Sequence, residues 1–301
     1  MNNKLDFDTD GKDWPNRDAS TFVEAGGLRF HAQIMGDGRD ILLLHGVGAS
    51  THSFRDLMPR LARDFRVVAV DLPGHGFTGT PLFLRMTLPG VSELLGDFCR
   101  AARVDPDVVV GHSIGAALAI RMAIDGIVSP REIVGFNGSL RPYAGAAAPI
   151  FSTLARLLFI NPFTPKLFAA TASPSRVETM INNTGSKIPR EGLDYYRRLF
   201  RNPGHVNGAL SMMAGMDLAP LQSDLPKLTQ HLTLVAAALD KTIAPSVAAD
   251  AIAKVPHGTL VRVKGLGHLA HEEDPEGALR IIRDAVAAHA PAIDAAPASD
   301  R

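Results

Sequence analysis

The stretch DVVVGHSIGAALAIRMAI, residues 107–124, constrains the fold more than any other part of the chain. Its three valines are typical of a strand buried on both faces, and the alanine-rich run after them is typical of a helix. Between them lies Gly-x-Ser-x-Gly, centred on Ser113. At a strand-to-helix junction this pattern predicts a nucleophile elbow, a tight and strained turn that exposes the serine hydroxyl at the carboxyl edge of a sheet. The alternative is a helix-capping serine flanked by glycines, and the placement after a buried strand favours the elbow.

Similar apolar runs recur along the chain and alternate with segments of helical character. A hairpin signal around Gly26-Gly27 comes first, and the later runs cover residues 41–45, 67–70, 108–110, 133–136, 232–238 and 259–263. Helices are expected at about 52–63, 90–103, 114–125, 246–254 and 275–289. Alternation of strand and helix predicts an α/β fold with a mostly parallel, doubly wound sheet.

One long segment breaks this alternation. Residues 140–216 show no clear strand and contain helical stretches interrupted by prolines, which predicts a helical cap between the sixth and seventh strands. Residues 21–139 and 217–290 then form the core, with a flexible arm at 1–20 and a flexible tail at 291–301. The cap has apolar residues at near-helical spacing, which fit core packing, a ligand wall or a membrane-contacting face: Phe151, Leu154, Leu157, Leu158, Phe159 and Phe163.

The amino-acid composition argues against several classes of function. The 301 residues include 31 Lys plus Arg and 31 Asp plus Glu, so the neutral chain gives no electrostatic case for binding nucleic acid. Cys99 is the only cysteine, which excludes an internal disulfide. The amino-terminal residues lack the apolar core of a signal peptide, and no transmembrane segment is predicted because no apolar run reaches 18 residues. We therefore expect a cytoplasmic protein and leave peripheral contact with a membrane open.

A serine hydroxyl needs a base before it can act as a nucleophile at neutral pH, and that base needs an orienting acid. His268 is the predicted base, because it follows a strand in the glycine-rich loop GLGHLAHEEDP. His271 is the competing candidate. It lies three residues further on, where we expect it to begin a helix and to cap it or face solvent.

The predicted acid is Asp240, which follows the strand LVAAAL. A turn or helix-start aspartate is the alternative reading of this position. Asp217 and Asp224 do not follow a strand, and the sixth strand is followed by Asn137 rather than by an acid.

Acyl transfer also needs N–H donors for the oxyanion that develops on the substrate. We predict that the backbone N–H groups of Val47 and Ile114 supply them, from the loop after the third strand and from the start of the helix after Ser113. His45 is expected to brace the first of these loops by hydrogen bonding.

No cofactor and no metal are predicted. Three histidines, His45, His75 and His112, lie near the expected site, but no Glu or Cys joins them at ligand spacing. The run Asp6-x-Asp8-x-Asp10-Gly resembles the start of a calcium loop, yet its twelfth position is Arg17 instead of glutamate.

Taken together, the stretches LLLHGVGAS, VVAVDLPGHGFT, VVVGHSIGAALA and GLGHLAHEEDPE resemble the α/β-hydrolase superfamily over about residues 21–290. Further stretches, DWPNRDASTFVEAGGLRFHAQIMG, LLFINPFTPKLFA, NNTGSKI and GALSMMAGMDLAPL, resemble the magnesium-chelatase accessory proteins of bacteriochlorophyll synthesis. That resemblance implies a role near magnesium insertion into protoporphyrin. The chain departs from the superfamily pattern at AAAL before Asp240 and at Met216, both outside the proposed catalytic residues.

Three hypotheses of function follow. The first is a serine hydrolase that cleaves an ester-like group of a small apolar or porphyrin-like substrate through an acyl-enzyme. The second is a non-enzymatic accessory that binds a porphyrin or assists magnesium-chelatase subunits as partners. The third is a related chemistry with the same three residues, such as carbon–carbon bond hydrolysis or haloperoxidation.

Overall fold

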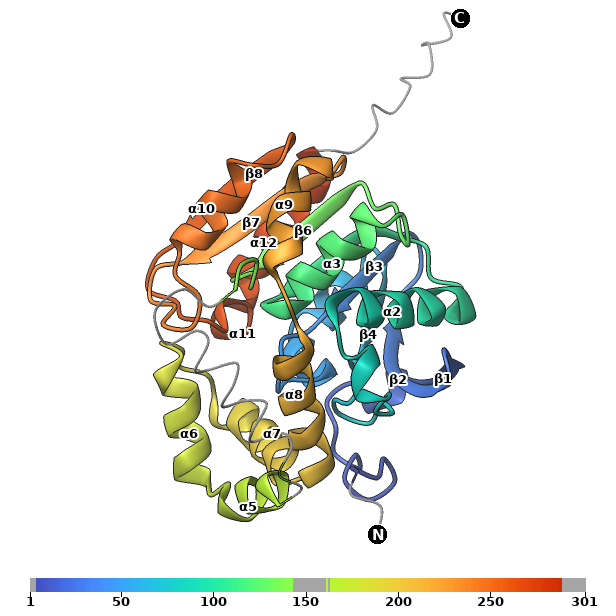
Figure 1. Ribbon diagram of the computed structural model, residues 1–301, viewed down its shortest axis with the longest axis vertical. Coiled ribbons are helices and arrows are strands. Elements are labelled where there is room, and N and C mark those ends of the chain that lie inside the picture. Colours follow the sequence, from blue (N-terminus) through green and yellow to red (C-terminus); the bar gives the residue numbers. More distant parts are fainter. Residues whose placement is uncertain (1–3, 143–160, 162, 289–301) are drawn as a thin grey trace, which may run out of the picture.

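One eight-stranded sheet forms the centre of the computed structural model, which describes residues 4–142, 161 and 163–288 (Figure 1). The strand order is β1-β2-β4-β3-β5-β6-β7-β8. β2 pairs antiparallel with β1 and β4, and all other neighbours are parallel. The strands are β1 (Ser20–Ala25), β2 (Leu28–Met35), β3 (Asp40–Leu44), β4 (Arg66–Val70), β5 (Pro106–His112), β6 (Glu132–Phe136), β7 (His231–Ala237) and β8 (Gly258–Val263). The predicted mostly parallel α/β fold is confirmed.

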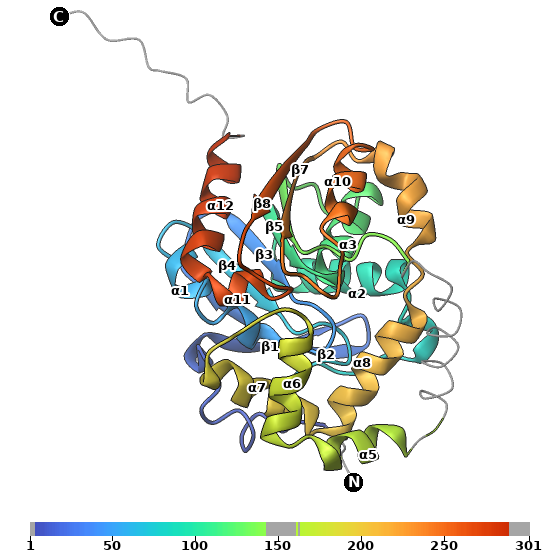
Figure 2. The ribbon, with the colours of Figure 1, turned by 90° about the vertical axis from the view of Figure 1, so that its left-hand side faces the viewer.

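Helices cover both faces of this sheet (Figures 1 and 2). They are α1 (Met58–Leu61), α2 (Leu88–Ala102), α3 (Ile114–Ile124), α9 (Ala219–Asp224), α10 (Ser246–Ile252), α11 (Ala270–Glu273) and α12 (Pro275–Ala288). One apolar core lies under α2, α3 and α10, and the other lies under α1 and α12. Leu42 and Leu44 of β3 enter the first core, whereas Ile41 and Leu43 enter the second. Because both faces of such a strand are buried, its sequence is continuously apolar.

The helical cap is inserted between β6 and β7, as predicted. Its described helices are α5 (Thr164–Thr171), α6 (Pro174–Asn183), α7 (Arg190–Phe200) and α8 (Pro203–Gly215), which are grouped on one side of the body in both views (Figures 1 and 2). Val177 and Tyr196 of the cap pack with Ala49 and Leu269 from loops of the core. The cap therefore covers the loops that follow β3 and β8.

Most of the apolar set predicted for the cap lies outside the described residues, as does the predicted tail at 291–301. This applies to Phe151, Leu154, Leu157, Leu158 and Phe159. Phe163, the described member of the set, is 71% exposed just before α5.

The amino-terminal segment differs from the loose arm that we expected over residues 1–20. Trp14 is only 2% exposed, and its indole N–H donates a hydrogen bond of 3.2 Å to the hydroxyl of Thr51. Its ring lies edge-on to those of Phe77 and Tyr195. Burial of this single large side chain fixes the segment against both the core and α7, which outweighs its polar composition.

The helix predicted at 52–63 is also different in the structure. A 3-10 helix at Thr51–Phe54 is followed, after a turn, by the single α-turn of α1. Pro59 explains the interruption, because a proline inside a continuous helix lacks the N–H donor and its ring clashes with the preceding turn. The other predicted helices of the core are present as α2, α3, α10 and α12.

None of the helices in the described part of the chain combines the length and the apolar character that crossing a bilayer demands.

Candidate active site

Ser113 lies in a strained turn between β5 and α3. Its φ of 52° and ψ of −116° fall outside the regions that side-chain-bearing residues normally occupy. Such backbone strain costs on the order of 1–3 kcal/mol and persists only where the surroundings enforce it. The N–H of Ser113 donates a 3.0 Å bond to the carbonyl of Phe136, and its own carbonyl accepts from Ser139. The turn is therefore held on both sides, as a nucleophile elbow requires.

The two glycines of the motif are needed for close approach. A Cβ built on Gly111 would lie 2.4 Å from the amide nitrogen of Ala116, within the helix that the turn begins. A Cβ on Gly115 would lie 2.1 Å from the carbonyl oxygen of Leu44 on β3. Any side chain at either position would push α3 away from the sheet, so the motif fixes where the serine is presented.

His268 and Asp240 come together at the carboxyl ends of β7 and β8. The Nδ1 of His268 lies 2.9 Å from Oδ2 of Asp240. The other oxygen of the carboxylate, Oδ1, accepts the backbone N–H groups of Thr242 and Ile243 at 2.8 and 2.9 Å. A carboxylate fixed in this way accepts the Nδ1 proton and leaves Nε2 of the imidazole as the basic nitrogen.

Asn137 is a further partner of this carboxylate. Its Nδ2 donates to Oδ2 of Asp240 at 2.8 Å, and its backbone is in the left-handed region, with a φ of 50°. From the sequence, Asn137 was only a position without an acid after the sixth strand. Its placement directly after β6 was the available signal, because the carboxyl ends of neighbouring parallel strands meet at one edge of a sheet.

Ser113 and His268 line one cavity of about 130 Å³ between the core and the cap. Val47 lines it as well. The cap contributes Met180 and Ile181 of α6, together with residues that include Thr184, Tyr196 and Phe200. The structure thus gathers the three predicted catalytic residues at one site, with a largely apolar wall opposite the serine.

The loop after β3 passes close to the serine. A Cβ on Gly46 would lie 3.2 Å from Cβ of Ser113 and 2.7 Å from Nδ1 of His112, so a side chain at position 46 would clash with those two side chains. Val47 follows in this loop, and Ile114 is the first residue of α3, whose N–H has no partner within the helix. Both predicted oxyanion donors therefore belong to segments that lie against Ser113.

His45 braces this loop as expected. Its Nδ1–H donates to the carbonyl of Gly46 at 2.8 Å, and its Nε2 accepts the N–H of Leu72 at 2.9 Å. Burial lowers the pKa of His45 below its ordinary value, which keeps the ring neutral and both bonds intact.

The expectation that His271 faces solvent or caps a helix is wrong. His271 is only 1% exposed within α11, and its Nε2–H donates to the hydroxyl of Ser53 at 2.8 Å. Burial lowers the pKa of His271 to about 3. Its ring packs 4.5 Å from that of His112, whose Nε2–H donates to the carbonyl of His268. These two histidines support the loop that carries His268 from behind.

A second Ser-His-Asp set lies elsewhere in the core. The imidazole of His31 joins Oδ2 of Asp71 at 2.8 Å and the hydroxyl of Ser20 at 3.1 Å. Asp71 also accepts the N–H groups of Thr51 and Phe77. These contacts tie β1 and β2 to the loops after β3 and β4. Ser20 begins β1, so it lies on a strand rather than in an elbow.

Within the described residues, no three His, Cys, Asp or Glu side chains are grouped closely enough to hold a metal ion.

Comparison with known proteins agrees with this geometry. The sequence profile of the alpha/beta hydrolase family matches residues 41–280, most of the chain. The chain belongs to the alpha/beta hydrolase family.

Individual relatives and a solved structure show how broad the likeness is. The magnesium-chelatase 30 kDa subunit of Rhodobacter capsulatus is 39% identical over 274 residues, which cover 90% of this chain and 95% of that protein. Pyrrolizixenacetamide deacetylase of Xenorhabdus hominickii is 26% identical over 87% of this chain and 96% of its own length. The solved epoxide hydrolase CorEH matches with a TM-score of 0.77 and 18% identity over 89% of this chain and 98% of its own, a likeness of fold alone.

A buried polar network behind the candidate site was missed from the sequence. Glu272 of α11 accepts hydrogen bonds from Arg55 at 2.7 Å, from Ser53 at 2.8 Å and from the hydroxyl of Tyr196 at 2.7 Å. Tyr196 belongs to cap helix α7 and lines the cavity. No local pattern could reveal the network, because its members are separated by up to 219 residues.

Proposed function

We propose that the chain is a serine hydrolase in which Ser113 is the nucleophile, His268 the base and Asp240 the orienting acid. The observation that carries the proposal is the combination of the strained elbow at Ser113 with the carboxylate-bound imidazole of His268 at one cavity. Strain of this kind is typical of functional positions, where it presents a reactive group.

The reaction follows from this arrangement. Nε2 of His268 takes the hydroxyl proton as Oγ of Ser113 attacks the acyl carbon of the substrate. The N–H groups of Val47 and Ile114 stabilise the negative oxygen of the tetrahedral intermediate. When the intermediate collapses, the imidazolium returns the proton to the leaving group and an acyl-enzyme remains. Water activated by the same nitrogen then releases the acid and restores the serine.

The lining of the cavity supports an apolar substrate, and the serine mechanism supports an ester-like bond in it. Its walls include Val47, Ile181, Phe200 and Leu269, and the cavity is small, so the group bound next to the serine must be compact. The Xenorhabdus relative is a deacetylase by name, which supports acyl transfer to water as the reaction class.

We also propose that the protein acts in bacteriochlorophyll synthesis as a magnesium-chelatase accessory. The 39% identity with the Rhodobacter capsulatus subunit over nearly the whole of both chains supports this role. A porphyrin-like molecule is then the candidate substrate, and the chelatase subunits are the candidate partners. The same identity favours a second function, in which the protein binds a porphyrin or assists the chelatase without catalysis.

Labelling with a fluorophosphonate probe tests the chemistry. The wild type should be labelled and Ser113→Ala should not, whereas Ser20→Ala should be labelled like the wild type. Ser20 is the matched control, because it too is hydrogen-bonded to a histidine that a carboxylate holds. Absence of label on the folded wild type, or equal label on Ser113→Ala, would refute the hydrolase.

Complementation of a deletion strain separates the two roles. If catalysis serves the pathway, Ser113→Ala fails to restore pigment although the protein accumulates to wild-type amounts. Full restoration by Ser113→Ala supports the non-enzymatic function, and unchanged pigment in the deletion strain itself refutes the assignment to this pathway.

A further inference from the structure

The cavity at Ser113 is too small to hold a substrate of ordinary size. It encloses about 130 Å³, whereas sites for small organic ligands measure roughly 300–1,000 Å³. A substrate that reaches the serine must therefore extend into a neighbouring space.

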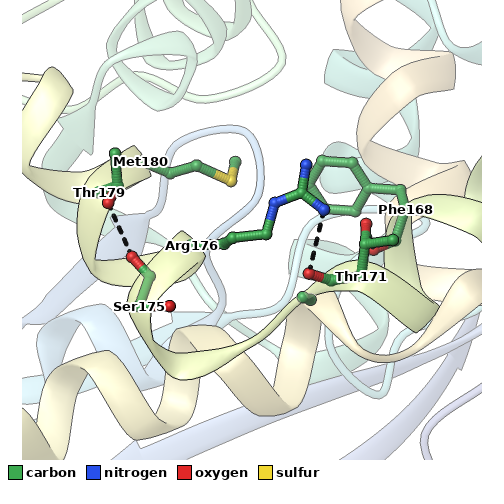
Figure 3. Close-up of a pocket in the computed structure, with 7 residues that line it drawn as sticks. Phe168, Thr171, Ser175, Arg176, Thr179 and Met180 are labelled. Carbon is green, nitrogen blue, oxygen red and sulfur yellow. Dashed lines mark hydrogen bonds between the residues drawn. The ribbon is translucent and has the colours of Figure 1, made fainter.

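A second hollow of about 290 Å³ lies between α5 and α6 in the cap (Figure 3). Met180 lines both this hollow and the cavity at Ser113, so α6 forms a wall that the two spaces share. Different residues of α6 line the two spaces, since Ile181 lines the serine cavity and Thr179 lines the hollow. Methionine is unbranched and flexible, which suits a side chain that must adapt to a ligand crossing between them.

The lining of the hollow combines apolar surface with one cation. Phe168, Ala172 and Met180 supply an aromatic ring, a methyl group and a thioether. Figure 3 shows the side chains of Arg176 and Met180 extending from α6 toward the side of the hollow where Phe168 lies. A flat or elongated apolar body would bury against these groups.

The guanidinium of Arg176 is available to bind an anion. Among the described residues no carboxylate pairs with it, and its guanidinium donates one long hydrogen bond, 3.4 Å, to the carbonyl of Thr171. The hydroxyl of Thr179 already donates to the carbonyl of Ser175 at 2.8 Å, so the guanidinium is the main polar group left for a ligand. A guanidinium fork binds a carboxylate through two parallel hydrogen bonds.

We propose that this hollow is a subsite for the distal part of the substrate, an apolar body that carries a carboxylate held by Arg176. The inference rests on the proposed hydrolase function, because it places the reacting ester at Ser113 and the carboxylate beyond Met180. The substrate class is thus an apolar ester with a second, free carboxylic acid.

A chain-length series of p-nitrophenyl esters tests the subsite. Hemiesters of dicarboxylic acids with 4 to 12 carbons are compared with the uncharged esters of the matching monocarboxylic acids, and the readout is the ratio of their kcat/KM values. At the preferred length the wild type should favour the hemiester. Arg176→Gln should lower the ratio by about tenfold, mainly through KM, and Arg176→Lys should lower it less, because a charge–hydrogen-bond contact of this kind contributes about a factor of ten.

Arg190→Gln is the matched control, since Arg190 is another exposed cap arginine, at the start of α7 and outside the hollow. It should keep the wild-type ratio. An unchanged ratio in Arg176→Gln, or the same fall in both variants, would overturn the subsite. Met180→Trp gives an independent check, because the larger side chain should lower the kcat/KM of long uncharged esters relative to short ones.

Isothermal titration calorimetry on Ser113→Ala tests the subsite independently of the proposed hydrolase activity. The variant cannot form an acyl-enzyme, so the binding of a dicarboxylic hemiester reports on the subsite alone. A Kd about tenfold weaker in Ser113→Ala/Arg176→Gln supports the subsite even if the wild type hydrolyses nothing. No binding, or binding that does not depend on Arg176, refutes the subsite even if short esters are hydrolysed.

Discussion

Replacing Tyr196 with phenylalanine should destabilise the fold by an amount that the structure allows us to work out. The phenol donates to Oε1 of Glu272 at 2.7 Å, and both residues are buried. Burial first, and then the neighbouring carboxylate, raise the pKa of Tyr196 well above its ordinary value, so the hydroxyl remains a donor at every working pH. The bond joins cap helix α7 to α11, the short helix that follows the His268 loop.

The size of this loss of stability depends on the hydrogen bonds that Glu272 retains in the variant. A hydrogen bond to a charged group contributes about 1.5–3 kcal/mol. Arg55 at 2.7 Å and Ser53 at 2.8 Å remain in place, so the carboxylate is not left unpaired and the larger penalty for a stranded buried charge is avoided. We expect Tyr196→Phe to lower the free energy of unfolding by about 2 kcal/mol.

The neighbouring tyrosine is the control. The hydroxyl of Tyr195 donates to Glu191 at 3.1 Å. Because Glu191 is exposed and stays hydrated, Tyr195→Phe should cost only about 0.5–1 kcal/mol. Urea-induced unfolding measures the free energies of both variants, followed by far-UV circular dichroism and by the fluorescence of Trp14, the only tryptophan in the sequence. A double-mutant cycle with Glu272→Gln should give a coupling of at least about 1 kcal/mol. Equal costs for the two tyrosine variants, or no coupling, would show that the network does not hold the cap.

Three further outcomes can be measured. Asp240→Asn should lower kcat/KM for a p-nitrophenyl ester by a factor on the order of 10⁴ while the fold is retained, because His268 loses the acceptor that fixes its tautomer; a fall below tenfold contradicts the assigned role. Gly115→Ala should abolish accumulation of folded protein, since its Cβ would lie 2.1 Å from the carbonyl of Leu44, and a folded, active variant would contradict that geometry. The free energy of unfolding should fall as the pH drops from 6.5 toward 3, because burial holds the pKa of His271 at about 3 and the unfolded chain therefore binds a proton before the folded chain does. His271→Asn should reduce the pH dependence of this free energy by at most about 1.4 kcal/mol per pH unit. Urea titrations that give the same pH dependence for the wild type and the variant would contradict this role of His271.

The parts of the site that were predictable are those fixed by local sequence or by strand ends. Ser113 was recognisable because the elbow needs its glycines at fixed positions within five residues. Asp240 and His268 follow two neighbouring parallel strands, and the carboxyl ends of parallel strands lie at one edge of the sheet. Short-range pattern and sheet topology together therefore located three residues that are far apart in the chain.

The parts that were not predictable depend on packing between distant segments. Residues 1–20 look polar, and nothing local shows that Trp14 fits between Phe77 and Tyr195. His271 precedes two glutamates and looks exposed, yet Ser53 and the rings of Phe54 and His112 cover it. The hollow beside Arg176 exists only because α5 and α6 are placed next to one another.

The second Ser-His-Asp set shows which features make such residues reactive. Ser20, His31 and Asp71 are linked at 3.1 and 2.8 Å. In the proposed set His268 is bound to Asp240, but within the described part of the chain no hydrogen bond joins it to Ser113, so connectivity alone would favour the second set. His31 is fully buried, however, and Ser20 lies on an ordinary strand. The strained turn and the cavity at Ser113 are thus the decisive features, and a fluorophosphonate label that disappears with Ser20→Ala but survives Ser113→Ala would show that this reasoning is wrong.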